Sequence, residues 1–375
     1  MAPALKAFYD KRRVERLAAE LARAWPAFPV DAFVADAARG LARMELMDRA
    51  RHIAGAMARA LPPAYPDALA IVLRALGPPL QGATGHGMAP FHFLPHTLFV
   101  AQRGLDHPDL SLDAQRGLTR RCSCEFSIRP FLERHPEATL RALEAWTGDA
   151  DEHVRRLVSE GTRPRLPWAA RLPRFQEDPA PVLRLLERLK DDPSEYVRRS
   201  VANNLNDVSK DHPALVVATC ERWLQGASAA RRRLVHHALR SLVRDGHADA
   251  IRLVGAQGGG AVTARASVEP RRARIGGSVR VHVELANGDA RAATAVLALR
   301  VHFVKARGGT APRSFRLRTT TLAPGGRAAL AKTLSLRQHS TRTHHPGTHR
   351  VEVVVNGEPR AAARFEVVAG GKKKD

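Results

Sequence analysis

The sequence has few of the residues that mark several common classes of protein. Its 375 residues include 3 cysteines, 3 tyrosines and 4 tryptophans, and aromatic residues make up 5% of the chain. Cys122, Cys124 and Cys220 form neither a zinc-ligand spacing nor an even disulfide set. We therefore expect a protein of a reducing cytoplasm that has no disulfide framework, no bound metal and no other cofactor.

Long apolar runs and acidic residues are also scarce. No run reaches the roughly 18 apolar residues that a membrane-spanning helix needs, and residues 1–13 lack the apolar core of a signal peptide. The chain has 60 Lys and Arg against 37 Asp and Glu, a net charge of +23. Such a surface favours a polyanionic partner, because neutralising phosphates releases their counterions. We expect a nucleic acid as the partner and no membrane.

A glycine-rich stretch divides the chain into two regions of different composition. We expect a helical domain over residues 1–254, a linker over 255–261, a β domain over 262–368 and a basic tail over 369–375. Residues 262–375 hold 22 Lys and Arg against 7 Asp and Glu, a net charge of +15, which leaves +8 for the first 261 residues. The β domain is therefore the more cationic of the two.

A helical motif occurs twice in the first region, forty-three residues apart. Its first copy is Leu140, Leu143, Glu144, Val154, Arg155, Arg156 and Val158, and its second copy is Leu183, Leu186, Glu187, Val197, Arg198, Arg199 and Val201. A period near forty residues with paired helices is typical of HEAT-like repeats. We predict an all-α HEAT-like repeat solenoid, with upstream helices over 5–25, 30–44, 46–61 and 66–76 and a loop over 82–96.

Beyond the glycines, apolar and polar residues alternate as they do in strands with one buried face. The clearest strands are predicted over 278–285, 296–303 and 349–355, and Asn356-Gly357 is a hairpin turn signal. About seven strands in this length predict an all-β immunoglobulin-like or fibronectin-like sandwich.

Charged and polar residues recur four positions after the second arginine of the motif. The pairs are Arg156 with Glu160 and Arg199 with Asn203, and fainter copies give Arg121 with Glu125 and Arg233 with His237. Residues four apart share one helix face. Ordinary solvated ion pairs, worth only ~0.3 to 0.5 kcal/mol each, are the alternative. Recurrence at one structural position favours a functional surface.

Two stretches hold most of the candidate site residues. In residues 152–168, a helix that ends at Glu160-Gly161 leads through Arg163 and Arg165 to Trp168. The alternative is that Gly161 is a C-cap and Trp168 covers the core. In residues 198–211, three asparagines and two aspartates, Asp207 and Asp211, lie in a predicted helix against their helix propensity. Residues that oppose the local secondary-structure propensity often mark a functional site.

Glu125, Glu160 and Asp207 are thus three acids on or near one face, among many arginines. Cleavage of an N-glycosidic bond passes through an oxocarbenium-like sugar, which a carboxylate stabilises while it orients a water. A cationic N-alkylated base is already a good leaving group. Such an enzyme needs no lysine nucleophile.

Residues 123–131, 153–168 and 196–207 resemble the AlkC branch of bacterial DNA alkylation repair glycosylases. The likeness covers residues 5–254, and residues 262–368 resemble the immunoglobulin-like domain of one subgroup. The resemblance implies an enzyme that removes 3-methylcytosine and 3-methyladenine from duplex DNA without fully flipping the base into a pocket.

The resemblance also implies roles for individual residues. Glu125 and Glu160 match acids that face the lesion, and Asp207 matches a further acid nearby. Trp168 matches the aromatic residue beside the sugar. Arg156 and Arg163 match basic residues close to the DNA backbone. Apart from the resemblance, we also expect DNA contacts from Arg121, Arg165, Arg199, Asn203 and Lys210, and from Arg337, Arg342 and His344 in a loop of the β domain. The spacing of His339, His345 and His349 suits no specific zinc pattern.

The sequence leaves three functional classes open. The leading hypothesis is a monomeric bacterial DNA N-glycosylase of base excision repair, acting on duplex DNA that contains alkylated bases. The alternative is a HEAT scaffold that binds nucleic acid or an acidic protein without chemistry. A lyase or nuclease for abasic DNA would need a poised lysine or a metal cluster. A phosphate-binding scaffold has no use for carboxylates inside a basic groove, which favours the glycosylase.

Overall fold

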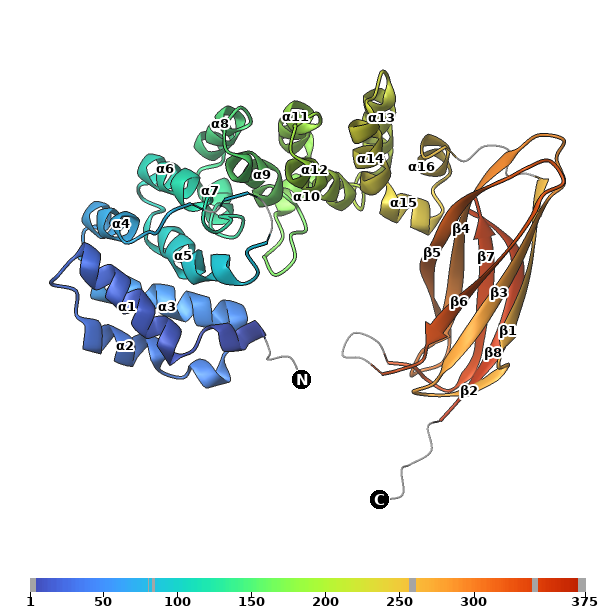
Figure 1. Cartoon of the computed structure of the whole chain (residues 1–375), viewed down its shortest axis with the longest axis horizontal. Coiled ribbons are helices and arrows are strands. Elements are labelled where there is room, and N and C mark those ends of the chain that lie inside the picture. The colour runs from blue at the N-terminus through green and yellow to red at the C-terminus, as the bar shows by residue number, and fades with distance from the viewer. Residues whose placement is uncertain (1–4, 80, 83–84, 256–260, 339–342, 370–375) are drawn as a thin grey trace. The chain divides into compact units, whose positions relative to one another are not determined.

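The computed structural model describes residues 5–79, 81–82, 85–255, 261–338 and 343–369. Helices occupy the chain as far as Leu253, and strands begin at Val262 (Figure 1). The predicted order of a HEAT-like helical region followed by a sandwich is therefore confirmed. The middle of the predicted linker, residues 256–260, lies outside the described residues, as do Arg342 and residues 370–375 of the predicted tail.

The first helices lie close to their predicted positions. They are η1 Leu5–Phe8, α1 Lys11–Ala24, α2 Val30–Ala38, η2 Leu41–Arg43, α3 Leu46–Ala60 and α4 Tyr65–Arg74. The predicted loop over 82–96 is only partly correct, because it contains η3 Ala89–Phe93 and the start of α5 Leu94–Arg103. Pro90 and Pro95 stand in the first turns of these two helices, where a proline is favourable because its missing N–H is not needed.

The two copies of the motif form neighbouring helix pairs. After α6 Pro108–Leu118 and α7 Arg129–Arg134 come α8 Pro136–Trp146 and α9 Glu152–Gly161, which hold the first copy. After α10 Pro173–Glu177 come α11 Ala180–Leu189 and α12 Glu195–Val208, which hold the second. Figure 1 shows α9 beside α12 and α8 beside α11. The apolar motif residues Leu143, Val158 and Val201 are fully buried.

The fainter upstream copy of the motif is not helical. Arg121 and Glu125 lie in the turns between α6 and α7, so they share no helix face, and that prediction was wrong. The later helices are α13 Pro213–Leu224, α14 Ala229–Ala238, α15 Arg240–Asp245 and α16 Ala248–Leu253.

Packing divides the chain into two compact units. The first comprises Met1–Asp211 with Ala229–Leu234, and the second comprises His212–Ser228 with Val235–Asp375. The second unit thus contains the last helices as well as the strands. Within it, Gly246 after α15 approaches Gly357 so closely that a Cβ on Gly246 would lie 3.3 Å from the Gly357 carbonyl oxygen.

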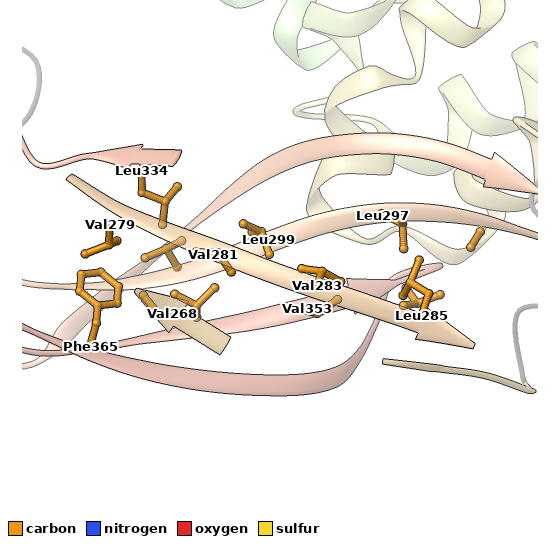
Figure 2. Close-up of a cluster of buried hydrophobic side chains, with 14 of the residues drawn as sticks. Val268, Val279, Val281, Val283, Leu285, Leu297, Leu299, Leu334, Val353 and Phe365 are labelled. Atoms are coloured by element: carbon orange, nitrogen blue, oxygen red, sulfur yellow. The ribbon is translucent and has the colours of Figure 1, made fainter. Parts of the chain in front are cut away.

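The β domain is a sandwich of two sheets. The three-stranded sheet has the order β1 Val262–Glu269, β3 Ser278–Asn287, β6 Arg327–Ser335. The five-stranded sheet has the order β2 Arg272–Arg274, β8 Glu358–Val368, β7 Gly347–Val355, β4 Ala293–Val304, β5 Thr310–Leu322. Alternate residues of β3, among them Val281 and Val283, meet Leu299, Val353 and Phe365 in the core (Figure 2).

Gly161, the last residue of α9, is not the C-cap that the alternative interpretation proposed. It is absent from the residues with positive φ, so it is not a left-handed C-cap. A Cβ at this position would lie 2.6 Å from Cγ2 of the buried Ile128. The end of α9 therefore approaches its neighbour closely only because residue 161 has no side chain.

We expect Gly161→Ala to lower the free energy of unfolding by about 1–3 kcal/mol, because the added methyl overpacks the contact with Ile128. Gly117→Ala in α6 is the matched control, since a Cβ there meets no atom within 4 Å. That control should gain about 0.5–1 kcal/mol from its higher helix propensity. Urea unfolding, monitored by circular dichroism, measures the free energy of unfolding of both variants. Equal stability of Gly161→Ala and the wild type would contradict this account of the glycine.

Candidate active site

Five charged side chains form a continuous chain of ion pairs, which we call the acid–arginine network. It consists of Glu125, Arg156, Glu160, Arg163 and Asp207. Arg156 donates a hydrogen bond to Glu125 Oε2, and its Nη2 lies 3.5 Å from Glu160 Oε1. Arg163 donates to Glu160 Oε1 at 2.6 Å through Nη1 and to Asp207 Oδ2 at 2.8 Å through Nε. The structure thus brings together the three predicted acids and two predicted arginines.

Two helices and two turns supply the network. Arg156 and Glu160 lie one turn apart on α9, and Arg163 follows in the turn after that helix. Asp207 comes from the last turn of α12, and Glu125 comes from the turns before α7. The repeat places α9 and α12 side by side, so side chains of one helix reach those of the other.

Two serines that the sequence analysis did not identify complete the hydrogen bonding. Ser200 donates to Glu160 Oε2 at 2.6 Å, and Ser123 donates to Glu125 Oε2 at 2.8 Å. Arg156 Nη1 also donates to Ser123 Oγ at 2.7 Å. A signal was present, because Ser200 directly follows the arginine pair of the second motif copy and Ser123 lies two residues before Glu125.

The pKa values of the buried acids follow from these contacts. Burial raises the pKa of Glu160, but Arg156, Arg163 and the Ser200 hydrogen bond outweigh it and hold that pKa below its usual range. For Asp207, burial outweighs the hydrogen bond from Arg163 and raises the pKa. Burial also works to lower the pKa of Arg156, but the charges of Glu125 and Glu160 raise it. Burial likewise works to lower the pKa of Arg163, but Asp207 and Glu160 raise it, so both arginines stay protonated.

The pair of Arg156 and Glu160 is not an ordinary solvated ion pair. The two side chains are 16% and 7% exposed. Buried ion pairs stabilise little unless every partner is satisfied, and removal of one partner is strongly destabilising. Arg156 and Glu160 are largely buried, so the alternative of an ordinary solvated ion pair is wrong for these two residues.

The end of α9 is held by hydrogen bonds to its last carbonyl groups. Thr162 Oγ1 donates to the Val158 carbonyl at 2.8 Å, and Asn204 Nδ2 donates to the Ser159 carbonyl at 2.7 Å. The last four carbonyls of a helix have no partners within it. Asn204, which is fully buried in α12, therefore has a structural reason to oppose helix propensity. These bonds fix the backbone beside Glu160.

Arg129, the first residue of α7, holds the segment that follows α9. Its Nη1 donates to the carbonyls of Gly161 at 3.1 Å and Arg163 at 2.8 Å, and its Nη2 donates to that of Ala170 at 2.5 Å. Arg129 is 4% exposed, and burial lowers its pKa to about 10. The sequence analysis missed this residue. The sequence did offer a signal, because Arg129 stands between Ile128 and Pro130-Phe131 in residues 123–131, one of the segments that carry the resemblance.

Trp168 lies in the segment that Arg129 holds. It is 60% exposed, so it does not cover the core, and that alternative was wrong. Its φ of +66° is unfavourable for a residue with a side chain. Trp168 and Arg129 line a hollow of about 280 Å³. The backbone is thus held in a strained conformation that presents an indole ring to the surface.

The other residues predicted to contact DNA in the helical region have different surroundings. Arg121 donates to the carbonyls of Gly77 and Gly117. Arg165 makes two hydrogen bonds to Asp211, at 2.6 and 3.2 Å. Arg199 and Lys210 are exposed, and Asn203 is half-buried.

In the β domain, Arg337 is exposed but His344 is not. The His344 side chain is 2% exposed, and its ring packs edge-on against Phe303 with the centroids 5.3 Å apart. In the structure His344 therefore does not offer its ring to DNA, contrary to the prediction. Within the described residues, no group of three or more His, Cys, Asp or Glu is arranged to hold a metal. In the same residues, no helix is long and apolar enough to cross a bilayer.

We expect Arg129→Met to loosen the segment that carries Trp168, because three carbonyls lose their donor. Trypsin should then cut faster after Arg165 and Arg171 in limited digestion of the folded protein. Arg134→Met is the matched control, since Arg134 lies on the same helix and pairs with the exposed Asp106. Unchanged cleavage of the segment in Arg129→Met would show that Arg129 does not hold it.

Comparison with known proteins gives a consistent result. Residues 121–242 match the family described as DNA alkylation repair enzyme, and residues 262–369 match the family described as YhaZ, C-terminal Ig-like domain. The uncharacterized protein YhaZ of Bacillus subtilis (strain 168) is 32% identical over 366 residues, which cover 97% of this chain and 99% of YhaZ.

A solved structure is similar over nearly the whole chain. It is the Pseudomonas fluorescens alkylpurine DNA glycosylase AlkC, bound to DNA that contains an abasic site analog. The TM-score is 0.89 at 34% identity, over 98% of this chain and 100% of AlkC. The chain therefore belongs to the AlkC-type family of DNA alkylation repair proteins, in which HEAT-like repeats are followed by a C-terminal immunoglobulin-like domain.

Proposed function

We propose that this protein is a DNA N-glycosylase that removes cationic N3-alkylated bases, 3-methylcytosine and 3-methyladenine, from duplex DNA. The observation that supports this most is the acid–arginine network, in which three carboxylates lie close together within a strongly basic chain. The similarity to AlkC, which is described as an alkylpurine DNA glycosylase and was solved on DNA, supports the same reaction class. We further propose that the protein acts as a monomer in the bacterial cytoplasm.

The reaction is the hydrolysis of the bond between C1′ of the deoxyribose and the base nitrogen. The bond breaks with its electron pair moving to the base, which neutralises the positive charge of the alkylated ring. The sugar becomes oxocarbenium-like, water oxygen bonds to C1′, and one proton of that water is released. Because the leaving group starts as a cation, no general acid is required.

The three carboxylates differ in what they offer to this reaction. Glu160 receives hydrogen bonds from Arg163 and Ser200, and its lowered pKa keeps it ionised, so it acts as a fixed negative charge near the sugar cation. Asp207 has a raised pKa and is the better acceptor for the proton of the attacking water. Glu125 receives both of its hydrogen bonds on Oε2.

Trp168 and the basic surface contribute binding. The exposed indole offers an apolar edge to a deoxyribose, and its fixed backbone means that little conformational freedom is lost on contact. The net charge of +15 on residues 262–375 supplies attraction to phosphates that does not depend on sequence. Within that domain, Arg337 is an exposed candidate for a direct phosphate contact.

We expect Glu160→Gln and Glu125→Gln each to reduce single-turnover release of 3-methyladenine by at least ~100-fold, because each removes a negative charge from the transition state. DNA affinity should change little, since an acid supplies no attraction to phosphates. Glu144→Gln on α8, an exposed partner of Arg188, is the control and should keep full activity. Chromatography of the freed bases measures the rate.

The alternative of a scaffold without chemistry gives a different result in the same experiment. It predicts equal DNA binding for all three variants and no freed base from any of them, including the wild type. Wild-type rates in both active-site variants would instead reject the catalytic assignment while leaving a glycosylase in place.

We expect Arg337→Gln to weaken binding to duplex DNA and to reduce the slope of log K against log salt concentration by about 0.9, the value for one lost phosphate contact. Arg360→Gln is the matched control, because Arg360 is exposed in the same domain but pairs with Glu358 at 2.6 Å. Fluorescence anisotropy of labelled duplex at several salt concentrations gives both slopes. An unchanged slope in Arg337→Gln would remove this residue from the DNA interface.

A further inference from the structure

A second hollow, of about 330 Å³, lies at one end of the acid–arginine network. Glu125 and Arg156 of the network form part of its wall. The rest comes from residues 85–94, from the turns after α6, and from His153 and Tyr196 on α9 and α12. We propose that this hollow binds the free alkylated base after the glycosidic bond has broken, an inference that rests on the proposed function.

The walls suit a flat aromatic ring. Phe91, Phe126 and Tyr196 line the hollow. The Tyr196 ring is held from two sides, with the Arg156 guanidinium carbon 5.2 Å from its centroid and the His153 ring edge-on at 5.7 Å. Every nucleobase has a π-face, so any of the bases can stack on an aromatic side chain. A ring fixed in this way stacks without losing further freedom.

Polar groups on the wall match the edge of an aminated base. The hydrogen bonds that Glu125 receives from Ser123 and Arg156 both end on Oε2, which leaves Oε1 without a partner among the described residues. The Tyr196 hydroxyl likewise has no hydrogen-bond partner in that part of the chain. A carboxylate oxygen accepts from the exocyclic amino group that adenine and cytosine share, and the hydroxyl donates to a ring nitrogen.

The size of the hollow favours a base over a nucleotide. Small-molecule sites range from ~300 to 1,000 Å³, so this hollow is at the lower end. A single ring system suits this volume better than a base that still carries its sugar and phosphate. The hollow therefore takes the leaving group next to the carboxylates that stabilise its departure.

The segment over the hollow is attached to the network helix. The Gly82 carbonyl lies 2.9 Å from His86 Nε2 and 3.2 Å from His153 Nε2, and His153 is on α9. Residues of the 85–94 segment and Glu125 line the same hollow. The same segment was predicted as a loop rich in glycine, histidine and phenylalanine, and the proposed function alone gives it no role.

The test is the binding of free 3-methyladenine to the full-length protein without DNA, measured by ligand-observed NMR. We expect saturable binding that Phe91→Ala weakens by about tenfold, the effect of one base-stacking contact. Tyr196→Phe keeps the ring and should weaken binding by a few-fold. Gln102→Ala, which alters the other hollow beside Trp168, should leave the affinity unchanged.

Each outcome decides the proposal. Absence of saturable binding, or binding that falls in Gln102→Ala but not in Phe91→Ala, would overturn it. A wild-type protein that releases methylated bases from duplex DNA yet does not bind the free base would keep the proposed function and reject the hollow as a base site. Binding of the free base by a protein that releases none would reject the proposed function and leave a base-binding site.

Discussion

Arg163 holds two carboxylates from neighbouring helix pairs, and the rest of the site depends on this contact. It donates to Glu160 at the end of α9 and to Asp207 at the end of α12. Without it, two acids would lie buried close together, and their mutual repulsion would protonate one or push the helices apart. With it, the chain keeps negative charge fixed at a point where the overall charge is strongly positive.

The surrounding structure keeps Arg163 in place. Arg129 donates a hydrogen bond to the backbone carbonyl of Arg163. Asn204 and Thr162 donate hydrogen bonds to the last carbonyls of α9. Gly161 lets α9 end against Ile128, and Trp168 takes a strained backbone in the segment that follows. A preorganised site of this kind stabilises charge as it develops, because no groups need to reorient during the reaction.

The sequence predicted the architecture and most of the network, for identifiable reasons. The forty-three-residue repeat gave α8–α9 and α11–α12, and four-residue spacing paired Arg156 with Glu160. The contacts of Arg129 could not be predicted, because its partners lie more than thirty residues away and are backbone carbonyls. The burial of His344 depends on packing against Phe303, which no local pattern shows. The upstream Arg121–Glu125 copy failed because the segment forms turns.

The central claim is that ionised carboxylates, and not acid catalysis, promote departure of the base. Its most direct test is the single-turnover rate of 3-methyladenine release as the pH is lowered from neutrality until the carboxyl groups are protonated. Because the pKa of Glu160 is lowered and that of Asp207 is raised, acidification leaves Glu160 ionised and protonates Asp207 first. The account predicts a rate that stays level and then falls as Asp207 is protonated. A rate that rises on acidification would show that a protonated group drives the reaction, and would contradict the account.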